Sequence, residues 1–266
     1  GVVFTDIVNE TNISILARNE IVESLEGTSF IPSAMIEGRK LSNVRLRTEN
    51  IPEQDELTVM MTMTEGSLYG GPVRGSFEYK PDSGNYQVDL SMVDVGLAGI
   101  AEGELSPDGK SGGKLMANLN FSGNTDTPEY RIGRGNIHID DADIAGNRGS
   151  MALLRLGQLM LPGYGGLEEA EIEILINGNE AILSDILLNS PSLIMRGEGR
   201  LRLSDFSLTA RLYPKGNLGA FSDVLSAVTG TVYAIDVEGT PGEPEMSLTP
   251  LPIMVSPPEF DTTNAN

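Results

Sequence analysis

His138 and the aspartates that follow it are the residues of this chain best suited to chemistry. His138 is the only histidine, so a catalytic triad would have to use it and a histidine-rich metal site is excluded. It falls in the polar phase of an alternating segment, which predicts a solvent-exposed side chain. Asp140, Asp141 and Asp143 offer oxygens to calcium but lack the acidic spacing and the closing glutamate of an EF-hand. Turn and capping roles explain them better, and we expect no metal site.

Four glutamates form an acidic run further along the chain. Glu168, Glu169, Glu171 and Glu173 precede or alternate with isoleucines such as Ile172, which is typical of the solvated face of a strand. Paired carboxylates in a cleft are also the machinery of glycosidases. Because nothing in the sequence places these glutamates in a cleft, we favour the solvated face.

Two Gly-x-Gly sites, at 133–135 and 197–199, resemble part of a dinucleotide fingerprint. Both lack its third glycine, and each opens a strand where the fingerprint must open a helix. The glycines more simply allow a bulge or the close approach of a neighbouring strand. The sequence therefore predicts no cofactor and no catalytic residues, and we expect that the protein is not an enzyme.

The composition excludes several classes of partner. The 266 residues are 39% hydrophobic, enough for a substantial core, and carry 18 basic against 38 acidic side chains, a net charge of −20. This charge opposes electrostatic binding to nucleic acid or to an anionic lipid surface. The absence of cysteine fits a reducing cytosol and a bacterial envelope equally well. The sequence contains no signal peptide and no run of 18 apolar residues. Gly1 is not a natural start, so a membrane anchor can precede it in a longer chain.

The elements that must position these residues are mostly strands. Residues 1–40 are ambiguous between strand and short helix, and we assign them to the same sheet as the rest. From Leu41 onward apolar and polar residues alternate with a period of two, which predicts half-buried strands. Turn signals at Pro81–Gly84 and at Asn177-Gly178 predict two hairpins. The alternating segments are Leu41–Leu46, Leu57–Met63, Val73–Tyr79, Tyr86–Met92, Leu115–Phe121, Glu171–Ile176, Ile182–Leu188, Leu201–Leu203 and Phe206–Leu212.

Two segments have helical periodicity instead. The stretch 149–161 places apolar side chains on one broad arc and ends at Pro162. It is too short to cross a bilayer, so we expect it to cover an apolar surface through Leu153, Leu156, Leu159 and Met160. A second apolar face, from Leu218 to Val228, predicts another covering helix.

An internal repeat organises the second half. Gly133–Ile144 matches Gly197–Leu208 at an offset of 64 residues, 197 minus 133, and a predicted helix follows each. We divide the chain into 1–40, a segment 41–249 containing the units 133–196 and 197–249, and a proline-rich disordered tail, 250–266.

The order of these motifs resembles the C-terminal region of AsmA-like bacterial envelope proteins. The resemblance covers about Leu57 to Pro252. It rests on the order of several weak motifs, namely Tyr69–Gly75, Asp94–Leu97, Gly133–Ile144, the leucine-rich helix, Ser190–Gly199, Leu212–Pro214, Val237–Pro244 and Pro250–Pro252. It implies an inner-membrane anchor at the N-terminus, a periplasmic body folded as a long curled antiparallel sheet, and passage of phospholipid between membranes. This chain departs from the family pattern because it lacks the anchor and the N-terminal half.

The residues and the resemblance together predict a mainly β protein: an elongated, curled, taco-like antiparallel sheet forming a groove, with two short covering helices. We expect its partners to be phospholipid or another acyl-chain lipid, with envelope proteins also possible. The rival hypothesis is an envelope assembly or scaffold protein with a closed β core, and a carbohydrate-active β-solenoid enzyme ranks third. The expected groove-lining residues are Val59, Met61, Met63, Phe77, Val88, Leu90, Leu119, Ile172, Ile174, Phe206 and Leu208.

Overall fold

The described residues form one open antiparallel sheet of 15 strands. The computed structural model describes residues 4–5, 10–18, 21–36, 39–51, 56–97, 113–140, 168–190, 194–215, 232–240 and 243–251. The strands are β1 (Phe4–Thr5), β2 (Glu10–Arg18), β3 (Ile21–Ile36), β4 (Arg39–Asn50), β5 (Val59–Leu68), β6 (Gly71–Lys80), β7 (Asn85–Gly96), β8 (Lys114–Asn124), β9 (Ile132–Asp140), β10 (Glu169–Asn177), β11 (Glu180–Asn189), β12 (Ile194–Arg202), β13 (Leu208–Lys215), β14 (Val232–Thr240) and β15 (Glu243–Leu251), with a short 3-10 helix η1 (Pro128–Tyr130). The mainly β fold expected from the alternation is confirmed.

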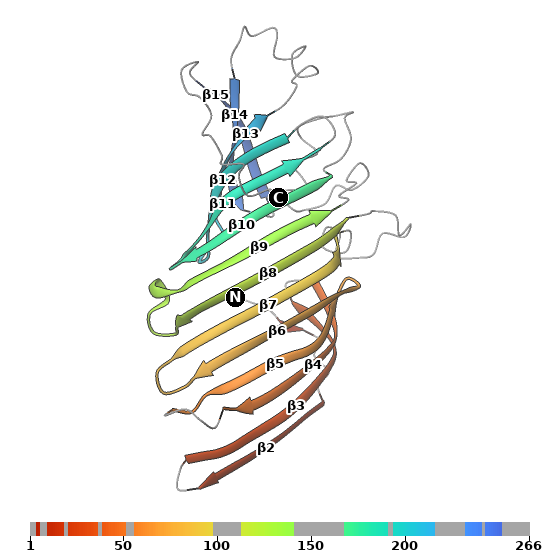
Figure 1. The fold of residues 1–266 in the computed structure, drawn as a ribbon, viewed down its shortest axis with the longest axis vertical. Coiled ribbons are helices and arrows are strands. Elements are labelled where there is room, and N and C mark those ends of the chain that lie inside the picture. Colours follow the sequence, from red (N-terminus) through yellow and green to blue (C-terminus); the bar gives the residue numbers. More distant parts are fainter. Residues whose placement is uncertain are drawn as a thin grey trace, which may run out of the picture.

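The sheet is a simple meander along its whole length. From β3 to β15 every strand pairs with the next strand in sequence, while β1 and β2 both pair with β3. The ambiguous N-terminal segment is therefore strand where it is described. The strands stack along the long axis of the molecule (Figure 1), which makes the sheet elongated. Within these ranges, no helix has the length and apolar character needed to cross a bilayer.

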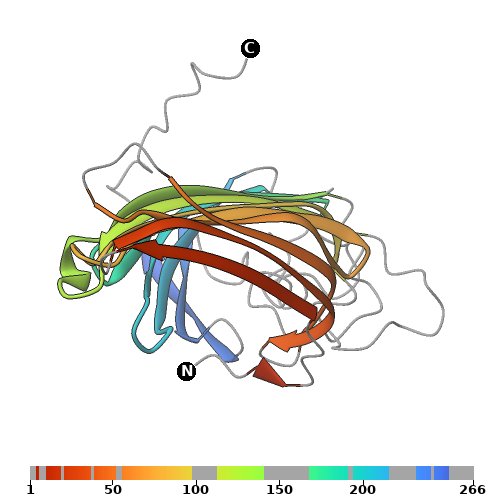
Figure 2. The same ribbon diagram turned by 90° about the horizontal axis from the view of Figure 1, so that it is seen from below.

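The expected taco-like curl is seen only in part, since the described sheet is open and only weakly curled. β3 to β9 form a shallow arch, and β14 and β15 turn away from it (Figure 2). The different orientation of β14 and β15 has a physical reason. Each strand pair adds a small twist of the same hand, and the sum of these twists rotates the two ends of a long sheet relative to each other. The helices expected over 149–161 and 218–228 lie outside the described residues, as do Leu153, Leu156, Leu159 and Met160.

Pairing in register places the apolar side chains of successive strands on one face. Directly opposed residues of an antiparallel pair point to the same side of the sheet. We call this side the apolar face. One line of opposed residues crosses it from β4 to β15, through Leu46, Met63, Gly75, Leu90, Leu119, Gly135, Ile174, Leu183, Gly199, Ala210, Val237 and Met246.

Burial on the apolar face changes along the strands. The row formed by Val95, Leu115, Ile139, Ala170, Leu188 and Met195 is at most 6% exposed, and we call it the buried margin. Seven residues along β7 towards the opposite end of the strands, the row through Phe77 and Val88 is partly open, with Phe77 40% exposed. The same row is buried further along the sheet, where Ile176 and Ala181 are 8% and 5% exposed. The apolar face therefore packs a core along one long side and meets solvent along the other side only over β5 to β8.

Both predicted hairpin turns are present, but one of them is shifted by one residue. Pro81–Gly84 closes the hairpin between β6 and β7 as expected, with the Gly84 N–H donating to the Lys80 carbonyl at 2.8 Å. Between β10 and β11, however, Asn177 still pairs with Glu180. The turn residues are Gly178 and Asn179, and Gly178 has φ +59°. A glycine at the first central position is the requirement of a type II′ turn, one residue later than the expected type I′ turn.

The difference in burial between the two faces predicts how truncations of two leucines on neighbouring strands, Leu188 on the apolar face and Leu175 on the opposite face, differ in their effect on stability. Leu188→Ala in the buried margin should reduce the free energy of unfolding by about 2–5 kcal/mol, because it leaves a cavity in a closed environment. Leu175→Ala makes the same truncation at a side chain that is 49% exposed, so its cost should be about 0.5 kcal/mol. Equilibrium unfolding in urea measures both, and equal losses would contradict a core that lies on the apolar face.

Candidate functional site

The apolar face gathers ten of the eleven residues expected to line a groove. Three adjacent rows contain nine of them. Met63, Leu90, Leu119 and Ile174 share one row with two glycines between them; Met61, Phe77, Val88 and Leu208 share a second; and Ile172 lies in a third, beside Ile137 and Ile186. Val59 points to the same face opposite Tyr79. These side chains come from six strands, β5 to β8, β10 and β13, and form a surface that extends along the sheet.

Phe206 is the exception. The sequence pattern places it in a strand, but β13 starts at Leu208, and Phe206 lies in the turn before it with φ +55°. Asp205 accepts the Ser207 N–H at 3.0 Å, and the Arg202 N–H donates to the Ser207 carbonyl. These contacts close the turn, so Phe206 is 59% exposed and does not belong to the apolar rows.

Aromatic side chains mark the open side of the apolar face. Phe77 stacks on Tyr79 at 6.1 Å between ring centroids, and Tyr86 meets Phe121 edge to face at 6.1 Å. Arg131 donates to the Tyr86 hydroxyl at 3.0 Å. We call Phe77, Tyr79, Tyr86 and Phe121 the aromatic margin. Because tyrosine has an apolar ring and a polar tip, this margin joins an apolar surface to water. The alternation predicts that these rings share a face. Phe77 and Tyr79 stack within one strand, whereas the contact of Tyr86 with Phe121 depends on the register between β7 and β8.

The glycines of the apolar rows let neighbouring strands approach closely. A Cβ on Gly135 would lie 2.6 Å from the Asn118 carbonyl oxygen and 3.0 Å from Leu119 Cδ1. The leucine therefore occupies the space that a side chain at Gly135 would need. Close strand approach, one of the two roles expected for the Gly-x-Gly sites, is confirmed here.

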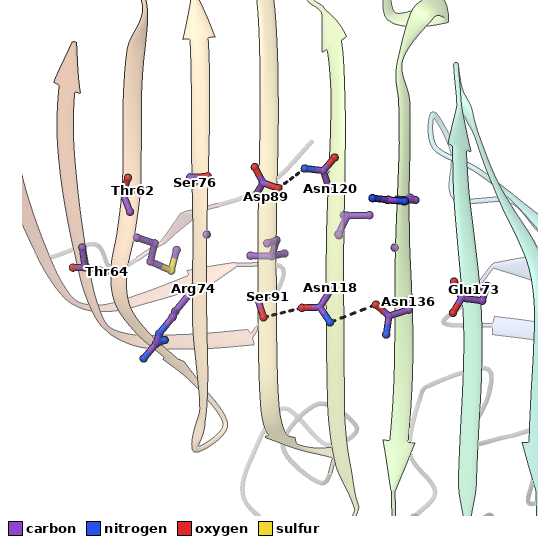
Figure 3. A pocket seen from close by; sticks show the side chains of 16 residues that line it. Thr62, Thr64, Arg74, Ser76, Asp89, Ser91, Asn118, Asn120, Asn136 and Glu173 are labelled. Carbon is purple, nitrogen blue, oxygen red and sulfur yellow. Dashed lines mark hydrogen bonds between the residues drawn. The ribbon is translucent and has the colours of Figure 1, made fainter. Parts of the chain in front are cut away.

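The opposite face is polar and contains a hollow that sequence reasoning missed. Two rows of side chains stand on either side of the backbone of Met63, Gly75, Leu90, Leu119 and Gly135, and enclose a cavity of about 760 Å³ (Figure 3). We call it the polar trench. One row is Thr62, Ser76, Asp89, Asn120 and Arg134; the other is Thr64, Arg74, Ser91, Asn118, Asn136 and Glu173.

The polar side chains of the trench bond to one another across strands. Ser91 donates to the Asn118 amide oxygen at 2.9 Å, and Asn118 donates to Asn136 at 3.4 Å. Asn120 donates to Asp89, and Figure 3 shows these bonds spanning β7 to β9. Cross-strand pairs of this kind stabilise a sheet, so the walls of the trench also hold its strands in register.

The trench contains two carboxylates, but not at glycosidase spacing. Asp89 on β7 and Glu173 on β10 both line it. Their strands are three positions apart in the sheet, which corresponds to roughly 14 Å at about 4.8 Å per strand. Glycosidase carboxyl pairs are separated by about 5–9.5 Å. This pair therefore does not fit that chemistry.

A second hollow of about 510 Å³ lies further along the polar face, over β11 to β14. Arg211 and Asp236 form an ion pair in it, with Arg211 Nη2 3.0 Å from Asp236 Oδ2. Thr249 donates to the same carboxylate at 2.6 Å. The hydrogen bond from Arg211, followed by the one from Thr249, lowers the pKa of the Asp236 carboxyl.

The side chain of His138 is less exposed than the sequence predicts. It lies on the polar face as predicted, but its side chain is only 23% exposed. Its Nε2 is 2.8 Å from Asp140 Oδ1, and its Nδ1 is 3.5 Å from Glu171 Oε1. The neighbouring strand supplies Glu171, so the partial burial depends on the register between β9 and β10, which the phase of one strand does not determine.

Comparison of the chain with family models, with curated proteins and with solved structures found no match in any of the three.

The Asp236 carboxylate predicts a pH dependence of stability. Because its pKa is lower in the folded state, its ion pair contributes stability above the unfolded value of about 3.9, and this contribution is lost as pH falls through the folded pKa. Asp236→Asn should therefore be less stable than the wild type at neutral pH, and the difference should close on acidification below about pH 4. Thermal unfolding across this range measures it, and a pH-independent difference would contradict the assignment.

Proposed function

We propose that this chain is part of an AsmA-like periplasmic protein whose apolar face binds phospholipid acyl chains and conducts them along the sheet between membranes. The apolar rows hold the chains and the head groups stay in water. The single observation that carries the proposal is the continuity of the rows from β5 to β13 together with their partial exposure over β5 to β8, where Met61 and Phe77 are 37% and 40% exposed. Exposed contiguous apolar surface of this kind marks binding sites.

The aromatic margin supports an orientation for the lipid. Acyl chains lie on the rows of Met61, Met63 and Leu90, and head groups lie beyond Tyr79 and Tyr86. Amphipathic rings suit such a boundary between hydrocarbon and water. Burial contributes about 0.8 kcal/mol per methylene group. Because neighbouring strands offer similar apolar rows, a chain moves from one strand to the next with small changes in free energy.

The remaining parts of the proposal follow the family resemblance. The protein acts in the periplasm, is tethered to the inner membrane by an N-terminal anchor, and serves outer-membrane biogenesis, with other envelope proteins as possible partners. The sheet curls further than its described part, and the helices 149–161 and 218–228 cover the apolar face and limit lipid passage. No step requires bond chemistry, so lipid binding should not depend on His138.

The buried margin favours a second candidate, an envelope scaffold with a closed β core. There the row through Ile139 and Leu188 is fully buried, as in an ordinary hydrophobic core. In a scaffold, the partly open rows near Phe77 would pack against other proteins and would hold no lipid. The two functions differ in whether purified protein contains lipid.

Phe77→Asp and Ser76→Asp test the proposal as a matched pair. They add the same charge at neighbouring positions of β6, one on the apolar face and one on the polar face. An unpaired carboxylate in apolar surroundings is costly, so Phe77→Asp should reduce bound phospholipid at least several-fold while Ser76→Asp retains it. Native mass spectrometry with lipid extraction measures bound lipid, and circular dichroism checks that both variants fold.

Lipid-free wild-type protein that also fails to take up fluorescent phospholipid from vesicles would reject the lipid proposal and favour the scaffold. Equal lipid loading of the two variants would place the lipid elsewhere than on the apolar face.

A further inference from the structure

Two neighbouring cross-strand pairs bring one imidazole and three carboxylates together on the polar face. His138 is opposite Glu171, and Asp140 is opposite Glu169, on the adjacent strands β9 and β10. Opposed side chains lie about 5 Å apart at Cβ, so the four groups occupy the corners of one small patch. The ligand atoms of His138, Glu169 and Glu171 all lie within 4.8 Å of one another.

The two nitrogens of the imidazole have different surroundings. Nε2 is 2.8 Å from Asp140 Oδ1, an ordinary hydrogen-bond distance. Nδ1 is 3.5 Å from Glu171 Oε1, which is longer than a good N–H···O bond of about 2.7–3.2 Å. Two ligands on a tetrahedral zinc ion, with bonds of about 2.0–2.2 Å, are however about 3.4 Å apart. The separation of Nδ1 and Glu171 therefore fits shared metal ligands better than it fits a hydrogen bond.

Asp140 occupies the place of a typical supporting group in a metal site. A histidine that binds a metal through one ring nitrogen usually donates the N–H of the other to a carboxylate, which fixes the ring and its tautomer. With its proton on Nε2 and directed at Asp140, the imidazole presents the lone pair of Nδ1 to Glu171 and Glu169.

The charge of the patch also favours a cation. Asp140, Glu169 and Glu171 carry three negative charges, and the imidazole can supply at most one positive charge. Lys114 is opposite Asp140 in the register, but its ammonium group lies 3.6 Å from Asp94. A divalent ion would offset the repulsion among the three carboxylates.

We propose that His138 Nδ1, Glu169 and Glu171 bind one divalent transition-metal ion, with zinc as the best match, and that Asp140 is a positioning residue. Imidazole and carboxylate are ordinary zinc ligands, and three protein ligands leave a position for water. Ligands of one zinc ion lie about 3.4 Å apart, so any pair of these ligand atoms nearer the 4.8 Å limit must close up by side-chain rotation on binding. The ion would join β9 to β10 at the ends of the strands nearest the buried margin.

Isothermal titration with zinc chloride, after removal of metal by EDTA, tests the proposal. The wild type should bind one zinc ion per chain. His138→Ala should remove this saturable binding. Asp140→Asn retains all three ligands and should weaken the affinity about 10–100-fold, the usual effect of losing a supporting carboxylate. Glu173→Gln is the matched control, because it removes one negative charge from the same face of β10 outside the patch, and its affinity should equal that of the wild type.

A second readout separates a specific site from ion adsorption on an acidic surface. Because His138 is the only histidine, an NMR spectrum of the imidazole nitrogens contains one residue, and zinc should shift its Nδ1 far more than its Nε2. Thermal unfolding without metal checks that each variant is folded. Equal zinc affinity in the wild type and His138→Ala, no zinc binding by the wild type, or an unshifted Nδ1 signal would each overturn the proposal.

Discussion

Register between neighbouring strands is the constraint on which the rest of this structure depends. Because side chains alternate between the two faces, a slip of one residue at any pairing would move the apolar residues of the following strand onto the polar face. The line from Leu46 to Met246 stays on one face through eleven successive pairings. The hydrogen bonds among Ser91, Asn118 and Asn136 and the contacts of Tyr86 with Phe77 and Phe121 hold the same register from opposite sides.

The sequence predicts the local features of this fold better than the global ones. Alternation in Leu57–Met63 and Tyr86–Met92 is enough to identify strands and to say which side chains share a face. The same pattern fails at Phe206, because the alternation continues across a turn closed by Asp205. The degree of curl follows from twist summed over many strands, which alternation does not encode. The surroundings of His138 come from Glu171, a residue on the next strand, and so depend on pairing that one segment cannot specify.

The two faces of the sheet impose different physical demands on the same strands. On the apolar face glycines such as Gly135 remove side chains where a neighbouring leucine needs room. On the polar face the same row of backbone forms the floor of the polar trench, between walls of amides, hydroxyls and charges. Both faces therefore depend on the same spacing between strands, and a substitution at one of these glycines would alter both faces together.

The meander topology has a consequence for how the chain folds. Since each strand from β3 to β15 pairs with its neighbours in sequence, the contacts of the described residues run mainly between consecutive strands, and such a topology favours rapid formation of hairpins. Such a sheet resembles a one-dimensional array, in which each element is stabilised by the two beside it. Opening then starts most easily at the outer strands β2 and β15, which have one partner each, and hydrogen exchange would proceed from these ends towards the middle of the sheet.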